Sequence, residues 1–64
     1  MEGNDMFKME FATDNAAFDD MPATECARIL RDIARKIETG ERLDGGPIRD
    51  INGNRIGHWE LASD

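Results

Sequence analysis

Side-chain oxygens recur at alternate positions in one segment of this 64-residue chain, where Asp50, Asn52 and Asn54 resemble the opening of a calcium-binding loop. Such a loop continues with a glycine at its sixth position and a bidentate glutamate at its twelfth, where this sequence has Arg55 and Leu61. The Asn-Gly pair inside the segment is instead a strong hairpin signal. We therefore predict a turn here and no metal site.

The chain has one cysteine and one histidine, which are too few for an internal disulfide or for a zinc site built from these residue types. Cys26 lies on an apolar stripe one helical turn before Leu30, so we predict a small buried side chain and not a nucleophile. His58 alternates with Trp59, and we predict that it is a surface residue. A lone thiol is typical of a reducing compartment, which favours the cytoplasm.

Two further patterns could act on a substrate but have simpler explanations. The carboxylates of Asp19 and Asp20 could exchange protons, but they stand just before Pro22, where acidic side chains cap a helix and face the positive end of its dipole. The segment Gly45-Gly46-Pro47 lacks the lysine and the following helix of a phosphate-binding loop. We predict a protein that is not an enzyme and needs no cofactor.

Three patterned runs would position these residues. Apolar and polar residues alternate from Met6 to Thr13, and this period of two predicts a half-buried strand. From Pro22 to Thr39 apolar residues recur every three or four positions, which predicts an amphipathic helix. Gly40 then stands where a left-handed helix cap is expected. Two short strands, about 48–51 and 55–61, are predicted around the Asn-Gly turn.

Two geometries are open for this hairpin. Asp50 can cap a type I turn with Gly53 in the left-handed conformation, or Asn52 and Gly53 can form a two-residue type I′ turn. The two alternatives differ by one residue in register, which changes the cross-strand partners.

The order strand, helix, strand, strand predicts a small α+β fold, in which a three-stranded antiparallel sheet carries one amphipathic helix on one face. Residues 6–62 form the single domain, and residues 1–5 are expected to be disordered. The open sheet face and the edge strands are available to a partner chain. No apolar run approaches the roughly 20 residues that span a bilayer, so we expect no membrane contact. The predicted core consists of Phe7, Met9, Phe11, Phe18, Ile29, Leu30, Ile33, Ile37, Ile48, Ile56, Trp59 and Leu61.

The formal net charge of −6 is confined to the first 25 residues, because residues 26–64 hold equal numbers of acidic and basic residues. An acidic surface repels nucleic acid and attracts basic proteins, so we expect a protein partner and no direct binding of DNA or RNA. The acidic N-terminus also differs from a signal peptide, which has a basic start. The carboxylates expected to form one partner-binding surface are those of Glu10, Asp14, Asp19, Asp20 and Glu25.

The chain resembles a group of very short proteins encoded by bacteriophages and prophages, over about residues 6–61. The resemblance rests on the segment Thr13-Asp14-Asn15-Ala16-Ala17-Phe18, on Ala27-Arg28-Ile29-Leu30 in the predicted helix, and on residues 50–57 in the predicted hairpin. Small acidic proteins of this kind include anti-defence proteins, among them anti-CRISPR proteins. The resemblance implies a stoichiometric inhibitor that blocks nucleic-acid recognition by a host defence complex, specifically a CRISPR–Cas effector, in the cytoplasm of the infected bacterium.

A homo-oligomeric structural or regulatory module with no immune role is the alternative. Arg28, Arg31 and Arg35 lie near one helix face, where we predict solvated side chains. A contact of these arginines with the acidic half of a second copy would give a homodimer. An open sheet edge offers a second route to a dimer.

Overall fold

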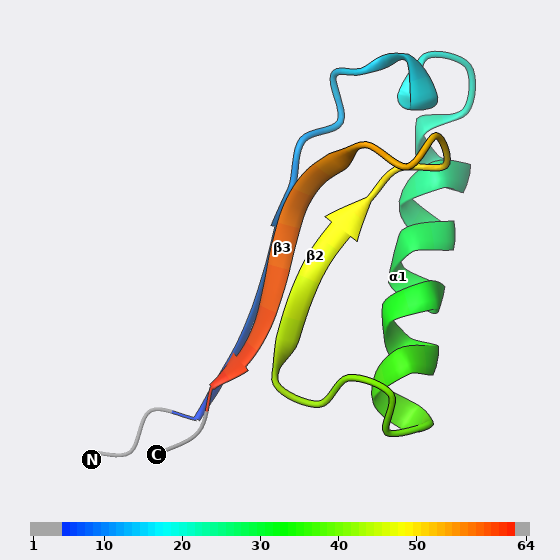
Figure 1. The fold of residues 1–64 in the computed structure, drawn as a ribbon. Coiled ribbons are helices and arrows are strands. Elements are labelled where there is room, and N and C mark those ends of the chain that lie inside the picture. The colour runs from blue at the N-terminus through cyan, green and yellow to red at the C-terminus, as the bar shows by residue number, and fades with distance from the viewer. Residues whose placement is uncertain (1–4, 63–64) are drawn as a thin grey trace.

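The computed structural model describes residues 5–62 and has helix α1 on one side of a three-stranded sheet (Figure 1). β3 is the central strand of this antiparallel sheet, whose order is β1-β3-β2. The predicted α+β fold and its order of strand, helix, strand, strand are confirmed. Apart from Asp5, the segment expected to be disordered lies outside the described residues. In chain order the elements are β1 (Met6–Phe11), the single-turn 3-10 helix η1 (Ala16–Phe18), α1 (Pro22–Glu38), β2 (Gly45–Arg49) and β3 (Arg55–Ala62).

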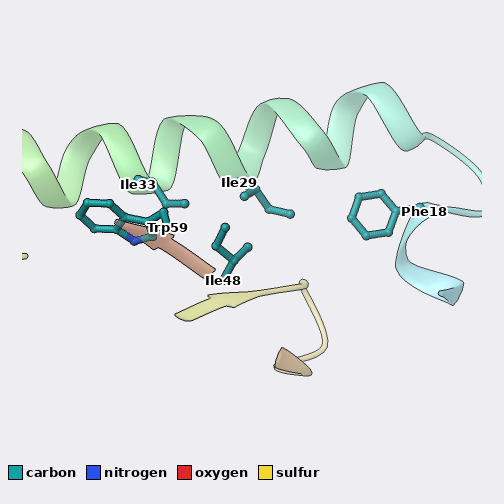
Figure 2. Packing of buried hydrophobic residues seen from close by; sticks show 5 residues of the cluster. All are labelled: Phe18, Ile29, Ile33, Ile48 and Trp59. Atoms are coloured by element: carbon teal, nitrogen blue, oxygen red, sulfur yellow. The ribbon is translucent and has the colours of Figure 1, made fainter. Parts of the chain in front are cut away.

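The register of β1 and β3 decides which side chains face the helix. Met9 lies opposite Trp59 and Phe11 opposite Gly57, and Trp59 packs beside Ile33 of α1 (Figure 2). Because successive side chains of a strand point to opposite faces, the odd-numbered residues of β1 face α1. The side chains on the opposite face, here called the open face, include Lys8, Glu10, His58 and Glu60.

Five hydrophobic side chains are buried between α1, the sheet and η1, and all five belong to the predicted core. Half-buried Met9, Phe11, Ile37 and Ile56, which were also predicted, pack against this cluster. The buried residues are Phe18, Ile29, Ile33, Ile48 and Trp59 (Figure 2).

Three residues of the predicted core are exposed, so the prediction is wrong for them: Phe7 is 45% exposed, Leu30 51% and Leu61 42%. The position of α1 gives the reason. The Arg28 guanidinium reaches the Arg49 carbonyl on β2, so the helix covers the β2 side of the sheet better than the β1 side. One helix leaves part of the inner face of β1 open.

The ends of α1 follow the sequence only in part. Pro22 occupies the first helical turn, and Gly40 follows the helix with φ of +79°, both as predicted. The predicted caps Asp19 and Asp20 are wrong, because the N-cap residue is Met21 and no side chain accepts a hydrogen bond there. Both aspartates are exposed instead.

The β2–β3 hairpin adopts the first of the two predicted geometries. The Gly53 amide donates to the Asp50 carbonyl at 3.0 Å, and the Asp50 amide donates to the Asn54 carbonyl at 2.9 Å. Gly53 has φ of +87°, whereas no non-glycine residue among those described has a positive φ, which excludes a type I′ turn on Asn52.

β2 begins three residues earlier than predicted and ends at Arg49, so the predicted strand at 48–51 is wrong in its bounds. Glycine and proline favour loops, but an edge strand tolerates Pro47 because it need not donate on its free side. Gly45 is required here, because a Cβ would lie 2.7 Å from the Trp59 carbonyl oxygen. Ile51 belongs to the turn.

Candidate functional site

Four of the five carboxylates predicted to bind a partner are exposed. Glu10 stands on the open face of β1, and Asp14 follows that strand. Asp19 and Asp20 follow η1 and precede α1. The segment from β1 to α1 arches over one end of the sheet, beside the N-terminal end of the helix (Figure 1). We call Glu10, Asp14, Asp19 and Asp20 the acidic end.

Glu25 does not belong to this surface, because it is buried with 6% of its area exposed. Its two carboxylate oxygens accept from the Arg28 guanidinium at 2.8 and 2.9 Å, and one of them also accepts from the Ile51 amide at 2.9 Å. The hydrogen bonds from Arg28 are the main reason that the pKa of Glu25 lies below its ordinary value; burial opposes them, and the Ile51 amide adds to them. Glu25 therefore holds the hairpin turn against the first turn of α1.

Asp50 is the second buried carboxylate, and sequence reasoning gave it only a turn-capping role. One of its oxygens accepts from the amides of Asn52 and Asn54, each at 2.9 Å. The other accepts from the side-chain amides of Asn15 at 2.8 Å and Asn54 at 3.2 Å. Burial by itself raises the pKa of Asp50, but these four donors together hold it below its ordinary value.

This use of Asp50 bears on the calcium-like pattern in the sequence. A carboxylate that already accepts four hydrogen bonds has its lone pairs directed at protein donors. The segment is built as a hairpin turn, as predicted. Among residues 5–62 no three His, Cys, Asp or Glu side chains gather as metal ligands.

The contact between Asn15 and Asp50 positions the acidic end. Asn15 is the N-cap of η1, and its side-chain oxygen accepts from the Ala17 amide at 3.1 Å. Its side-chain nitrogen binds the hairpin turn through Asp50. Phe18, the last residue of η1, anchors that helical turn in the core, and its ring stacks near Phe11 at a centroid distance of 6.2 Å. The acidic side chains thus extend from a backbone that is tied down at two points.

Two of the three arginines of α1 form ion pairs within the helix. Arg28 pairs with Glu25, and both Arg35 and Lys36 pair with Asp32. Exposed ion pairs one helical turn apart contribute only a few tenths of a kcal/mol. Arg31 and Arg35 are exposed, as predicted, whereas Arg28 is half-buried beside the buried Glu25, so the predicted solvated face is wrong for Arg28.

The other residues singled out from the sequence have modest surroundings. Cys26 packs against the core but is only half-buried, so the predicted buried side chain is confirmed in part. His58 is exposed, as predicted, while Trp59 is buried. A shallow hollow of about 350 Å³ lies beside the end of β1 and is lined by Glu10, Phe11, Ala12, Ile56 and Gly57. Glu10 is its one charged side chain.

In comparisons with known proteins, no family model, no curated protein and no solved structure matches this chain. No helix among residues 5–62 is both long and apolar enough to span a bilayer.

Proposed function

We propose that this chain is a non-catalytic inhibitor that binds the cationic nucleic-acid site of another protein with its acidic end. The exposure of Asp14, Asp19 and Asp20 on one tethered segment is the observation that carries the proposal. Carboxylates held on an ordered backbone can form charge-assisted hydrogen bonds with lysine and arginine side chains where phosphates would otherwise lie. Less conformational entropy is lost on binding when the segment is ordered beforehand.

The partner proposed is a host defence complex, and specifically a CRISPR–Cas effector in the bacterial cytoplasm. Such a complex holds nucleic acid in a positively charged channel. An anionic protein with a formal net charge of −6 is steered toward such a channel, and salt weakens this steering. The resemblance to short phage proteins supports this choice of partner. Glu25 is left out of the contact surface because it is buried.

The test is a binding assay between the tagged chain and purified CRISPR–Cas effector complexes, with target DNA as competitor. The triple variant D14K/D19K/D20K brings the formal net charge to zero, and we expect it to lose binding while its circular dichroism spectrum stays unchanged. Wild-type protein should compete with target DNA, and binding should weaken as salt is raised.

A matched variant separates local from global charge. E38K/E41K/D44K changes the net charge equally, but its residues are exposed near the C-terminal end of α1, at the opposite end of the molecule (Figure 1). We expect this control to keep most of its affinity. Equal loss of binding in both triple variants would mean that net charge alone acts, and retained binding by D14K/D19K/D20K would exclude the acidic end as the binding surface.

A further inference from the structure

The outer edge of β1 can be paired by another strand. Ala12 donates its amide to the Ile56 carbonyl at 2.9 Å, which places Ala12, Glu10 and Lys8 at the positions that bond to β3 in the alternating antiparallel pattern. The backbone N–H and C=O groups of Phe7, Met9 and Phe11 therefore point away from β3. Within residues 5–62 no strand lies beside this edge.

The other edge of the sheet is protected. Pro47 in β2 has no N–H to donate. The Arg42 guanidinium donates to the Gly45 carbonyl at 2.7 and 2.9 Å and lies against Gly46. Proline and a covering side chain are common devices against edge pairing. β1 contains no proline, and no side chain of residues 5–62 is found bonded to its outer edge.

We propose that β1 docks antiparallel against β1 of a second copy of this chain, about a two-fold axis at Met9, so that two sheets join into one sheet of six strands. In this register Met9 lies opposite Met9 of the second copy, and Phe7 lies opposite Phe11. All of these residues have outward-pointing backbone groups, so the pairs Met9–Met9, Phe7–Phe11 and Phe11–Phe7 are the hydrogen-bonded ones.

The charges of β1 select this register. A two-fold axis at Met9 places Lys8 opposite Glu10 of the second copy, twice, and these are the pairs with the closer side chains. An axis at Lys8 would place the two lysines opposite each other, and an axis at Glu10 would do the same with the two glutamates. Like charges directly opposite one another are destabilising, so of these three axes only the one at Met9 gives two favourable pairs between residues of β1. Both side chains are exposed, and no ion pair within residues 5–62 holds either one.

Apolar burial adds to the charge argument. In the joined sheet both helices lie on the same face, and the inner face of the two β1 strands lies between them. Phe7, which is 45% exposed, and the half-buried Met9 and Phe11 would cover one another there. A second copy would bury the apolar area of these side chains that the monomer leaves exposed.

This inference does not depend on the proposed inhibitor function. The dimer uses Lys8 and Glu10, whereas Asp14, Asp19 and Asp20 lie beyond the paired strand and stay exposed. Glu10 contributes to both surfaces, so the variants that test each proposal are kept separate.

The first experiment is sedimentation equilibrium of the intact chain over a range of concentrations. We expect a monomer–dimer equilibrium for wild type. K8E and E10K each turn both intermolecular pairs into like-charge pairs, and we expect each to raise the dimer dissociation constant by about tenfold. The double variant K8E/E10K restores opposite charges and should recover most of the affinity. R31E is the control for K8E, because Arg31 is an exposed cation on α1.

Cysteine pairing reads the register directly and is independent of those charges. Lys8 also faces Glu60 within the monomer, so K8E can act on folding as well as on association. In a C26A background, mixing K8C protein with E10C protein under mild oxidation should give a disulfide-linked dimer, since opposed residues of this kind lie about 4.5 Å apart at Cα. Each variant alone should crosslink far less. A wild type that stays monomeric at about millimolar concentration, or K8C that crosslinks to itself as fast as to E10C, would overturn the proposal.

Discussion

A single missing side chain, at Gly57, allows β1 and β3 to approach. A Cβ on Gly57 would lie 2.6 Å from the Phe11 Cα and closer still to the Glu10 carbonyl oxygen. These atoms are backbone, so no rotamer change can relieve the contact. The Phe11 side chain lies over the position that a side chain of residue 57 would fill. Gly57 is thus a packing requirement of the central strand and not a turn signal.

G57A is therefore expected to lower the free energy of unfolding by about 1–3 kcal/mol, the usual cost of forcing extra volume into a packed site. Urea denaturation followed by Trp59 fluorescence measures it. G46A is the matched control on β2, because its new methyl group meets only the movable guanidinium of Arg42. A loss of stability in G57A no larger than that in G46A would contradict this account.

Elements at one end of the fold are joined by two buried carboxylates in addition to the apolar contacts of Phe18. Glu25 ties α1 to the hairpin turn, and Asp50 ties that turn to the N-cap of η1. If one of these segments moved away alone, the buried carboxylate and its N–H donors would both lose their hydrogen-bond partners. Leaving buried polar groups unpaired costs more than the hydrogen bond itself contributes. The three segments should therefore separate together.

The pH dependence of stability tests this connection. The folded-state pKa values of Glu25 and Asp50 lie below their ordinary values of 4.5 and 3.8. The folded state therefore favours the ionised form of both carboxyl groups. Their contribution is complete above the ordinary values and is lost as the pH falls through the folded-state values. We expect the free energy of unfolding to be nearly level from pH 7 to pH 5 and to fall steadily below about pH 4.5.

Glu25→Gln removes one of these groups, so the fall between pH 5 and pH 3 should be shallower than in wild type. Glu38→Gln, which removes an exposed carboxylate from the same helix, corrects for the change in net charge. Denaturant unfolding at each pH gives the comparison. If E25Q and wild type lost stability with the same slope, Glu25 would not be the acid-sensitive contact.

How far the sequence predicts each element depends on whether the deciding contact is local. The periodicity of 22–39 and the Asn-Gly turn gave α1 and the hairpin, because both signals lie within the segment itself. The bounds of β2 and the exposure of Phe7 and Leu30 depend on where one helix lies over three strands, which no local pattern records. Glu25 was misassigned to the acidic surface for the same reason, since its partner Ile51 is 26 residues away.

The candidate site was predictable to a similar degree. Composition alone located the acidic segment, and its exposed members Asp14, Asp19 and Asp20 follow from the polarity of a connection. The tether between Asn15 and Asp50 was not foreseen, although the segment from Asp50 to Asn54 carried a turn signal. A side-chain contact across 35 residues leaves no trace in spacing.

At the scale of the whole molecule, the small core limits the stability of the monomer. Only five hydrophobic side chains are buried among the described residues. A chain of this length buries roughly 60% of the surface that its unfolded form exposes, and such domains often gain stability from a partner. Pairing at the open edge of β1 would bury more surface and add backbone hydrogen bonds. We therefore expect folding and association to be coupled.

This coupling predicts a melting temperature that rises with protein concentration. A dimer that binds only folded chains stabilises them by mass action, and the effect grows with the ratio of concentration to dissociation constant. Raising the concentration a hundredfold should raise the melting temperature of wild type by several degrees, because about 1 kcal/mol shifts it by roughly 4–8 °C in a domain of this size. E10K, with its weakened dimer, should melt at a temperature that changes much less over the same range. At low concentration both proteins are monomers, and both melting temperatures should become independent of concentration. If the melting temperature of wild type were independent of concentration, the edge of β1 would stay unpaired and dimerisation would contribute nothing to the stability of the chain.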